Sequence, residues 1–205
     1  MTLSPFIRGE LAHQLTVYLI RHGETDWTAA HRHNSRTDIP LSARGRRQAE
    51  ALGKELGGVR FDRIYCSPSL RAAQTAEIAL AERVITLCGD LVEWDYGVLE
   101  GKSVSEIREI IPEWTPWTHE FPGGETLAQL RLRVRKFADK VIEAPGLVGI
   151  VSHGHTLRVF SAVWLGLTVD VASRLQMAPA SISILDWEYS LPTIRQWNFQ
   201  PVSCL

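Results

Sequence analysis

The first long apolar run of the chain ends in a charged turn, and this feature constrains the fold more than any other. The run covers residues 17–20, is typical of a buried strand, and is followed directly by Arg21, His22 and Gly23. Ligands of open α/β sheets bind beyond the carboxyl ends of the strands, so this turn predicts a site. Gly23 permits sharp backbone geometry and close approach of a ligand to main-chain N–H groups. Arg21 offers a forked, permanently charged donor set that suits phosphate, and His22 can be a nucleophile near neutral pH.

Strand and helix patterns alternate along the rest of the chain. Further strands are expected at residues 63–66, 84–87, 147–151, 181–187 and 193–199, the last two joined by a turn at Pro192. Amphipathic helices are expected at residues 42–56, with Ser42 as the cap, and at 71–81, 103–111, 125–143 and 157–165. This alternation predicts an α/β fold, a three-layer α/β/α sandwich around a mostly parallel sheet.

We expect one domain over residues 1–205, with an N-terminal extension at 1–15. The irregular, aromatic-rich segment 112–124 is expected to form a cap or rim over the site. Residues 1–14 hold no apolar stretch long enough for a signal peptide, and no run approaches the roughly 20 apolar residues of a membrane span.

Composition narrows the class of protein. The formal net charge is −1, so the sequence gives no reason to expect strong nonspecific binding to nucleic acid or to an anionic membrane. Cys66, Cys88 and Cys204 are too few and too scattered for a disulfide framework or a zinc cluster. The sequence therefore predicts a cytoplasmic enzyme or binding protein.

A second apolar run, residues 147–151, also ends in a turn that contains a histidine and a glycine, His153 and Gly154. In a parallel sheet both turns lie at the same edge, so His153 is expected close to His22. Arg71 follows a third strand and stands on the first turn of a helix, whose N–H groups favour an anion. Two histidines and two arginines around one point would suit a dianionic phosphoryl group, because phosphoryl transfer depends mainly on positioning and charge stabilisation.

A proton donor for the leaving oxygen is expected in residues 91–101, which place carboxylates among aromatic residues and glycines. A carboxyl flanked by aromatic groups can have its pKa raised toward neutrality and act as a general acid. The candidates are Glu93, Asp95 and Glu100, and their spacing alone does not choose among them.

Five segments appear in a fixed order along the chain. They are Leu19-Ile20-Arg21-His22-Gly23-Glu24-Thr25, Thr37-Asp38-Ile39-Pro40-Leu41-Ser42 with Gly45, Ser67-Pro68-x-x-Arg71-Ala72-x-Gln74-Thr75-Ala76, Glu93-x-x-Tyr96-Gly97-x-x-Glu100-Gly101, and Ser152-His153-Gly154. Together they resemble the histidine phosphatase superfamily, which contains cofactor-dependent phosphoglycerate mutases, fructose-2,6-bisphosphatases and small acid phosphatases. The chain is most similar to the branch of acid phosphatases and sugar bisphosphatases.

The resemblance implies a role for each of these residues. His22 would be the nucleophile that becomes phosphohistidine, and Glu93 would be the proton donor that later activates water. The groups that would hold the phosphoryl oxygens are the side chains of Arg21, Arg71 and His153 and the main-chain N–H of Gly154. No metal and no other cofactor is implied.

Departures from the family pattern bear on the substrate. Thr28 stands where the family often has an asparagine that contacts the phosphate, and Asn34-Ser35 replaces a common Gln-Gly or Thr-Gly pair. Thr28 and Asn34 can still donate hydrogen bonds, so Thr28, Asn34 and Ser35 are kept as candidate phosphate-binding residues. The mutase branch usually carries a longer basic insertion where this chain has residues 102–120, with few basic residues.

These features favour a phosphatase that acts on a small phosphorylated metabolite, such as a sugar phosphate or bisphosphate, and that forms a homodimer. The alternative within the family is a cofactor-dependent phosphoglycerate mutase. The alternative from another class is a catalytically idle protein that binds a phosphate ligand.

Other residues in these motifs have simpler interpretations. His155 with His153 lacks a third nearby ligand, so a structural role is expected rather than a metal site. Cys66 is separated from Arg71 by four residues with no glycine, unlike the five-residue loop of thiol phosphatases, so a thiolate nucleophile is not expected. Packing in the core or rim is the simpler role for the aromatic residues Trp94, Tyr96, Trp114 and Trp117.

Overall fold

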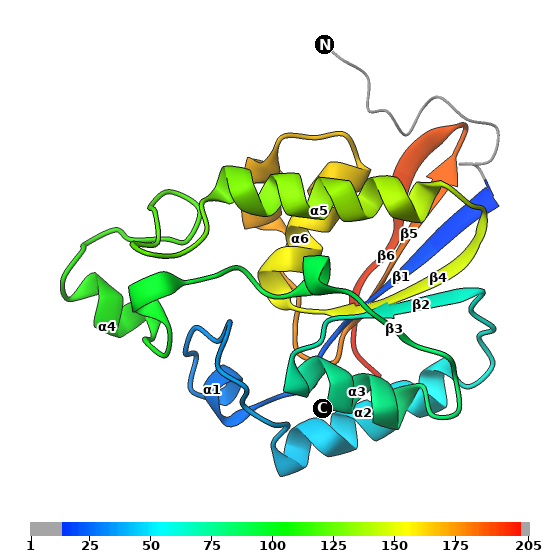
Figure 1. Cartoon of the computed structure of the whole chain (residues 1–205), viewed down its shortest axis with the longest axis horizontal. Helices are drawn as coiled ribbons and strands as arrows, with labels where there is room; N and C mark the ends of the chain where they lie inside the picture. Colours follow the sequence, from blue (N-terminus) through cyan, green and yellow to red (C-terminus); the bar gives the residue numbers. More distant parts are fainter. Residues whose placement is uncertain (1–13, 202–205) are drawn as a thin grey trace.

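The computed structural model describes residues 14–201, and these build one six-stranded sheet (Figure 1). The strands are β1 (Leu15–Arg21), β2 (Arg63–Cys66), β3 (Thr86–Leu87), β4 (Gly146–Ser152), β5 (Ile182–Glu188) and β6 (Leu191–Phe199). Their order is β3-β2-β4-β1-β5-β6, in which β3, β2, β4 and β1 run parallel and β5 and β6 are antiparallel additions. The predicted, mostly parallel sheet is confirmed.

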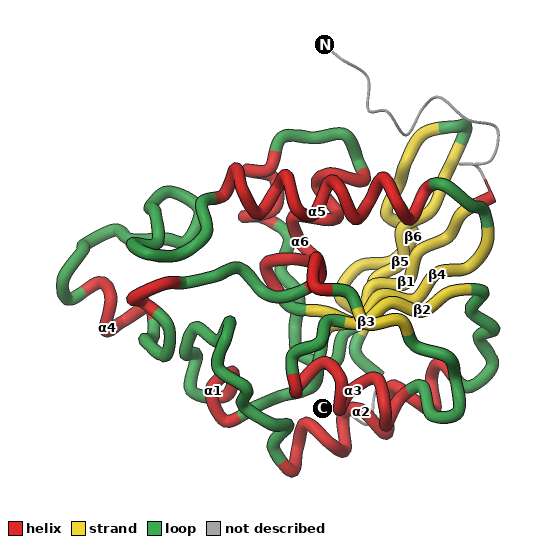
Figure 2. The backbone as a smooth tube through the Cα atoms, viewed as in Figure 1, coloured by secondary structure: helices red, strands yellow, loops and turns green. Residues whose placement is uncertain are grey.

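Helices cover both faces of this sheet (Figure 2). They are α1 (Asp26–Ala29), α2 (Ala43–Leu56), α3 (Leu70–Ala79), α4 (Val104–Arg108), α5 (Leu127–Ile142) and α6 (Gly154–Trp164). The pair α2 and α3 packs on one face, and the pair α5 and α6 packs on the other. The three-layer α/β/α arrangement is therefore confirmed, and α1 and α4 lie beyond the carboxyl ends of the parallel strands (Figure 1).

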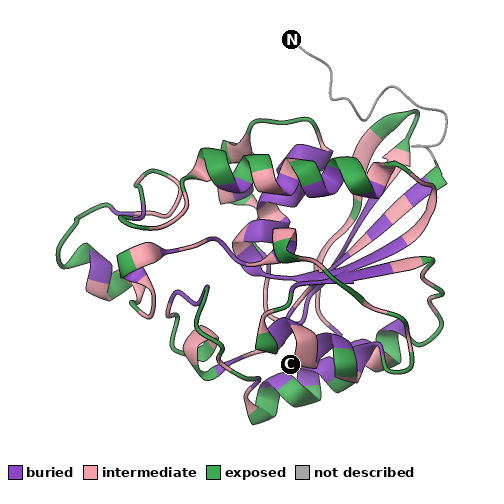
Figure 3. Ribbon diagram, in the orientation of Figure 1, coloured by how far each residue is buried: buried purple, intermediate pink, exposed green. Residues whose placement is uncertain are grey.

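The core is divided by the sheet, and β1 contributes to both halves. Val17 and Leu19 point into the apolar cluster under α5 and α6, while Ile20 belongs to the cluster under α2 and α3. All three side chains are buried, as expected for a parallel strand covered on both faces (Figure 3). Arg21 and His22 therefore leave the sheet from its middle.

One helix start agrees with the sequence-based expectation, and another differs from it in a way that matters for the site. Ser42 caps α2 as predicted, because its hydroxyl accepts a hydrogen bond from Gly45 N–H at 3.0 Å. In contrast, α6 begins at Gly154 rather than at residue 157, since His153 already has the extended backbone of an N-cap. The N–H groups of residues 154–156 therefore have no acceptor within the helix and can donate to groups outside it.

The predicted turn at Pro192 is wrong. The hairpin between β5 and β6 turns at Tyr189 and Ser190, whose φ angles of 48° and 67° give the left-handed geometry of a tight two-residue loop. Pro192 lies inside β6 and pairs with Trp187. Because β6 is the edge strand of the sheet, the missing N–H of proline is tolerated there.

Several expectations concern the ends of the chain and the irregular segment. Residues 1–13 of the predicted extension and Cys204 lie outside the described residues, and Leu15 already belongs to β1. Residues 112–124 form turns, and the segment is fixed by the buried side chains of Trp114 and Phe121. Within residues 14–201, none of the helices combines the length and the apolar character needed to cross a membrane.

Candidate active site

The turns after β1 and β4 meet because these strands are parallel neighbours. Arg21 pairs in register with Ser152, and the main-chain N–H of His22 donates to Ser152 O at 3.0 Å. The next residues of the two strands, His22 and His153, consequently face each other with ring centroids 5.1 Å apart. The structure thus brings together the two histidines that the sequence placed at one sheet edge.

His22 is held as a neutral imidazole with one free nitrogen. Its Nδ1 lies 2.7 Å from Gly23 O, so Nδ1 carries the proton and Nε2 keeps its lone pair. The ring is only 3% exposed, and burial together with the charges of Arg71 and Arg21 holds its pKa well below the usual value. A neutral imidazole with an unprotonated Nε2 is the form in which histidine acts as a nucleophile.

Two buried arginines flank this histidine. Arg71, on the first turn of α3, donates to the main-chain oxygens of Asn34 and Ser35 at 3.0 and 3.1 Å. Arg21 donates to Met177 O, and its guanidinium lies against Gly154, where an added Cβ would stand 3.2 Å from Cζ. Neither arginine forms an ion pair with a carboxylate of the described residues. Because a buried charge is costly unless it is paired, both guanidinium groups are suited to binding an anionic ligand.

Unpartnered polar atoms gather around the same point. Buried atoms without a hydrogen-bond partner within residues 14–201 include Nε of Arg21, Nε of Arg71, Nδ1 of His153 and both amide atoms of Asn34. Such atoms are rare in folded proteins, because each costs free energy to bury. Their clustering marks a place that a polar ligand completes.

A cavity of about 270 Å³ opens at this place, and we call it the anion cavity. Its walls include Arg21, His22, Thr28, Asn34, Glu93, Gly154 and His155. Thr28 reaches the wall, but its hydroxyl is engaged with the Thr25 main chain at 2.8 and 3.0 Å as part of the cap of α1. Arg71 and His153 are fully buried beside His22 and are not among the lining residues.

Glu93 lies in the wall of the anion cavity as an ionised carboxylate. Burial alone raises its pKa, but the neighbouring His155 and the main-chain N–H groups of Trp94, His155 and Thr156 outweigh burial and hold the pKa below the usual value. These N–H groups stand 3.0, 3.1 and 3.0 Å from the carboxylate oxygens. The expected upward shift of this pKa is therefore wrong, because the first turn of α6 supplies donors that stabilise the charged form.

The geometry distinguishes Glu93 from the other two candidate carboxylates. Asp95 forms an ion pair with Arg36 and faces a different cavity. Glu100 accepts hydrogen bonds from the main-chain N–H groups of Ser35 and Thr37 at 2.9 and 3.1 Å. Of the three, only Glu93 lines the anion cavity.

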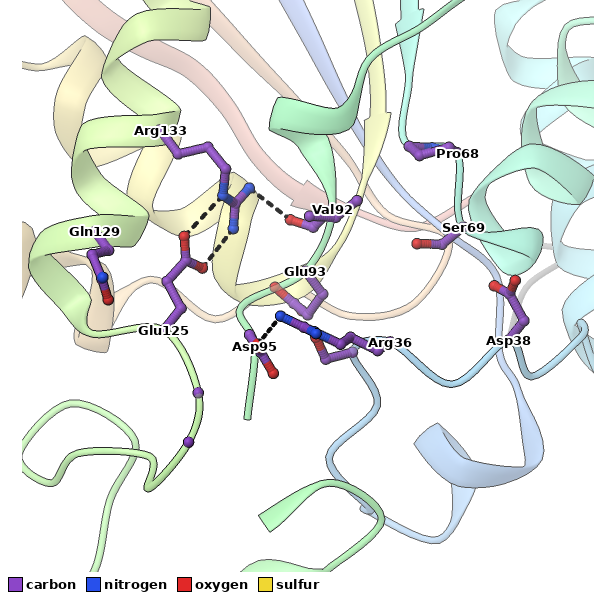
Figure 4. A pocket seen from close by; sticks show the side chains of 13 residues that line it. Arg36, Asp38, Pro68, Ser69, Val92, Glu93, Asp95, Glu125, Gln129 and Arg133 are labelled. Atoms are coloured by element: carbon purple, nitrogen blue, oxygen red, sulfur yellow. Dashed lines mark hydrogen bonds and ion pairs between the residues drawn. The ribbon is translucent and has the colours of Figure 1, made fainter. Parts of the chain in front are cut away.

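A larger cavity of about 730 Å³ adjoins Glu93, and we call it the side cavity (Figure 4). Its lining includes Ser35, Arg36, Asp95, Glu125 and Arg133. The structure thus places Ser35 here and not in the anion cavity.

A family model for the histidine phosphatase superfamily (branch 1) matches residues 17–200. The chain belongs to this superfamily. It is 39% identical over 177 residues to an acid phosphatase of Mycobacterium tuberculosis, covering 84% of this chain and 87% of that protein. It is 34% identical over 187 residues to a probable phosphoglycerate mutase GpmB of Salmonella choleraesuis, covering 86% of each.

Solved structures agree with this assignment. The open reading frame Rv3214 from Mycobacterium tuberculosis superposes with a TM-score of 0.87 at 36% identity, covering 91% of this chain and 98% of that one. The mycobacterial glucosyl-3-phosphoglycerate phosphatase Rv2419c, in complex with VO3, gives a TM-score of 0.81 at 27% identity, covering 90% and 98%. The predicted family, fold and enzyme class of this histidine phosphatase are confirmed.

Sequence reasoning gave no role to several residues of this histidine phosphatase that the structure brings to the site. Ser67 Oγ lies 2.8 Å from Nε2 of His153 and fixes that ring. Arg133 binds both oxygens of Glu125, at 2.9 and 2.7 Å, and donates to Val92 O, so it supports the segment that carries Glu93. Ser67 belongs to the family motif that contains Arg71, so its role could have been predicted from the sequence. No sequence pattern around Arg133 indicates its role.

Arg158 also reaches the anion cavity, one helical turn beyond Gly154. It donates to the main-chain oxygens of Ala172 and Ser173, at 2.8 and 2.9 Å, and its guanidinium carbon lies 4.6 Å from the ring centre of Trp117. Burial lowers its pKa to about 10, which leaves it charged at neutral pH.

Two alternative chemistries can be compared with the described residues. Burial raises the pKa of Cys66 to about 12, so its sulfur is a thiol at neutral pH, in agreement with the expectation that it is no nucleophile. Within residues 14–201, no group of three or more His, Cys, Asp or Glu side chains is arranged to hold a metal ion. Trp94 and Trp114 are fully buried and pack in the core, as expected.

Proposed function

We propose that this protein hydrolyses small phosphate monoesters through a phosphohistidine on His22, with Glu93 as the proton carrier and without a metal. One observation carries the proposal. A neutral histidine with a free Nε2 shares one cavity with an ionised carboxylate and stands beside two buried guanidinium groups that form no ion pair with a carboxylate of residues 14–201. Those two charges supply the stabilisation that phosphoryl transfer requires.

The first half of the reaction transfers the phosphoryl group to the protein. Nε2 of His22 attacks phosphorus, the N–P bond forms and the ester P–O bond breaks. The side chains of Arg21, Arg71 and His153 and the N–H of Gly154 donate to the phosphoryl oxygens. The leaving alkoxide takes a proton from Glu93, which gains that proton on substrate binding because a phosphate dianion beside it raises its pKa.

The second half returns the protein to its starting state. Glu93, again a carboxylate, removes a proton from water as the water oxygen attacks phosphorus. The N–P bond breaks, inorganic phosphate leaves, Glu93 releases the proton to solvent, and His22 recovers its lone pair. Dividing one difficult displacement into two easier steps is the advantage of covalent catalysis.

Residues that the family resemblance offered as phosphate ligands enter the proposal unequally. Asn34 is 7% exposed and lines the anion cavity, and neither of its amide atoms has a hydrogen-bond partner in the described part of the chain, so we assign it a hydrogen bond to substrate. Thr28 lines the cavity but is not assigned a hydrogen bond to substrate, since its hydroxyl is hydrogen-bonded to the main chain of Thr25. Ser35 faces the side cavity and contacts the site only through its main-chain oxygen on Arg71.

A screen of phosphate release over sugar phosphates, phosphoglycerates and nucleotides tests the proposal. The variant His22→Ala is expected to lose more than ~10³-fold in kcat, because removing the nucleophile disables the whole catalytic unit. Tyr189→Ala is the control, since Tyr189 is exposed in the hairpin between β5 and β6 and lines neither cavity. When turnover is stopped with alkali, mass spectrometry should detect a phosphoryl group on His22. Activity of His22→Ala comparable to that of wild type would contradict the assignment.

The same screen separates hydrolysis from mutase activity. A mutase would pass the phosphoryl group from His22 to a second hydroxyl of 3-phosphoglycerate instead of to water. Residues 102–120 stand where the mutase branch has a basic insertion. They contribute Val104 and Pro116 to the lining of the anion cavity, and neither side chain has a charge that could bind the carboxylate of phosphoglycerate. Isomerisation of 3-phosphoglycerate without release of phosphate would replace the phosphatase by the mutase.

The remaining expectations are part of the proposal. We place the protein in the cytoplasm, as a single domain with residues 112–124 as its rim, and as a homodimer. Sedimentation of the purified full chain tests the dimer directly, and cell fractionation tests the location.

A further inference from the structure

His155 offers the anion cavity a hydrogen-bond donor that no step above uses. It stands on the first turn of α6 and lines the cavity together with His22 and Glu93. The side chain is 17% exposed, because Trp94 and Trp117 contact its ring with centroid distances of 5.8 and 5.2 Å. The ring is thus packed against two tryptophans, and it contributes to the lining of the cavity.

Tyr96 determines where the ring proton lies. Its hydroxyl is 2.6 Å from Nδ1 of His155, and the tyrosine is 2% exposed. A buried hydroxyl must donate to an acceptor, and Nδ1 is the acceptor within reach among residues 14–201. Burial raises the pKa of Tyr96 well above its usual value, so it keeps this proton. Nδ1 accordingly accepts, and the proton of the ring is on Nε2.

The free nitrogen of His155 is therefore a neutral donor. Burial lowers the pKa of His155 to about 3, so the ring carries no charge near neutral pH. Its hydrogen bonds within the described part of the chain use Nδ1 and the main-chain N–H, which leaves Nε2–H for a molecule in the cavity.

The position of this donor relates it to the leaving group. The main-chain N–H of His155 donates to Oε2 of Glu93 at 3.1 Å, and Nδ1 lies 4.0 Å from the same oxygen. In an in-line displacement the nucleophile and the leaving oxygen stand on opposite sides of phosphorus. Because Glu93 protonates the leaving oxygen, the ring beside Glu93 faces the alcohol portion of the substrate and not the phosphoryl oxygens.

We propose that the Nε2–H of His155, oriented by Tyr96, binds a hydroxyl oxygen adjacent to the ester oxygen and so selects phosphate esters of polyhydroxy alcohols over those of simple alcohols. The inference rests on the proposed phosphatase activity and names its substrate class. A substrate that lacks the hydroxyl leaves the donor unpaired in a largely buried site, which weakens transition-state binding.

The test compares kcat/KM for glycerol 1-phosphate with that for n-propyl phosphate, which has the same carbon chain without the two hydroxyls. The wild-type protein is expected to prefer the glycerol ester by about tenfold, the equivalent of ~1.4 kcal/mol. His155→Phe keeps an aromatic ring, and it is expected to bring the ratio of the two kcat/KM values close to one. The reason is that kcat/KM should fall for glycerol 1-phosphate and stay unchanged for n-propyl phosphate. Tyr96→Phe, which frees the tautomer, is expected to give an intermediate ratio.

Two further variants keep the test decisive. His155→Gln retains an N–H donor and is expected to restore part of the preference, while Tyr189→Phe, in the exposed β5–β6 hairpin and outside both cavities, is expected to leave it unchanged. Equal losses on both esters in His155→Phe would show a packing role and overturn the inference. If the wild-type protein hydrolysed both esters equally, the role of His155 would be overturned while the proposed phosphatase activity stood. If it released phosphate from neither ester, both would be overturned.

Discussion

Oε1 of Glu93 accepts two hydrogen bonds from Thr156, one from the main-chain N–H at 3.0 Å and one from the hydroxyl at 3.1 Å. This pair joins the carboxylate of the site to the first turn of α6. Free N–H groups at a helix N-terminus carry partial positive charge, and here they stabilise a carboxylate of the protein itself. The anion cavity is in consequence built from charges of both signs, with Glu93 as the negative one.

The first prediction concerns stability in acid. The pKa of Glu93 is lower in the folded protein than in the unfolded chain, so its contribution to stability is fully present above the unfolded value of about 4.3. That contribution is lost as the pH falls through the folded pKa, because the unfolded chain binds the proton first. Urea denaturation between pH 6 and pH 3 should show a steeper loss for wild type than for Glu93→Gln. Parallel curves for the two proteins would contradict this assignment.

The second prediction concerns the protonation of His22. Its pKa lies well below the usual value because of burial and two neighbouring arginines. Nitrogen-15 NMR of the ligand-free protein should therefore show a neutral ring with the proton on Nδ1 from pH 7 down past the usual histidine value of about 6.5. A His22 ring that gains a second proton within this pH range would mean that it is not held as described.

The third prediction concerns Arg133, which connects α5 to the segment that carries Glu93. Its guanidinium forms a bidentate pair with Glu125 and also donates to Asp90 O and Val92 O, at 2.8 and 3.0 Å. Replacing it with leucine should lower the free energy of unfolding by ~2–3 kcal/mol, since three partly buried acceptors lose a charged donor. We expect kcat to fall as well, because Glu93 loses its support.

Arg195 supplies the matched control for that experiment. It pairs with Asp186 at 2.7 Å, but the arginine is 53% exposed. Arg195→Leu should cost less than ~1 kcal/mol, as is usual for exposed ion pairs. Urea denaturation of both variants decides the matter, and equal losses would show that Arg133 acts only as a surface charge.

Much of the site could be predicted from the sequence because its residues follow apolar strands directly. Arg21, His22 and His153 each come at the end of such a strand, and parallel neighbours must bring their ends to one edge. The predicted β2 (residues 63–66) agrees with the structure, since a short apolar run before Ser67-Pro68 admits few other interpretations.

The ionisation of Glu93 could not be predicted, because two of its three main-chain donors, the N–H groups of His155 and Thr156, lie more than sixty positions away in the chain. The aromatic neighbours suggested an apolar surrounding and a raised pKa. The start of α6 at Gly154 was missed by three residues, since the cap residue His153 offers no side-chain hydrogen bond that a sequence pattern would reveal. Because that boundary was missed, so were the N–H groups of His155 and Thr156, which are among the groups that lower the pKa of Glu93.

The last prediction tests how closely the backbone of Gly154 must approach Arg21. A Cβ on Gly154 would stand 3.2 Å from Cζ and 3.4 Å from Nε of Arg21, which is tight enough to displace the guanidinium. Gly154→Ala should therefore lower kcat/KM for phosphate esters by more than ~10-fold, because small misplacements of a positioning group are costly in catalysis. The helix itself should tolerate alanine, so the melting temperature should stay within a few degrees of wild type. Gly58→Ala is the control, since a Cβ there meets nothing within 4 Å and should change neither quantity. An unimpaired Gly154→Ala enzyme would show that the guanidinium of Arg21 does not need this contact to bind phosphate.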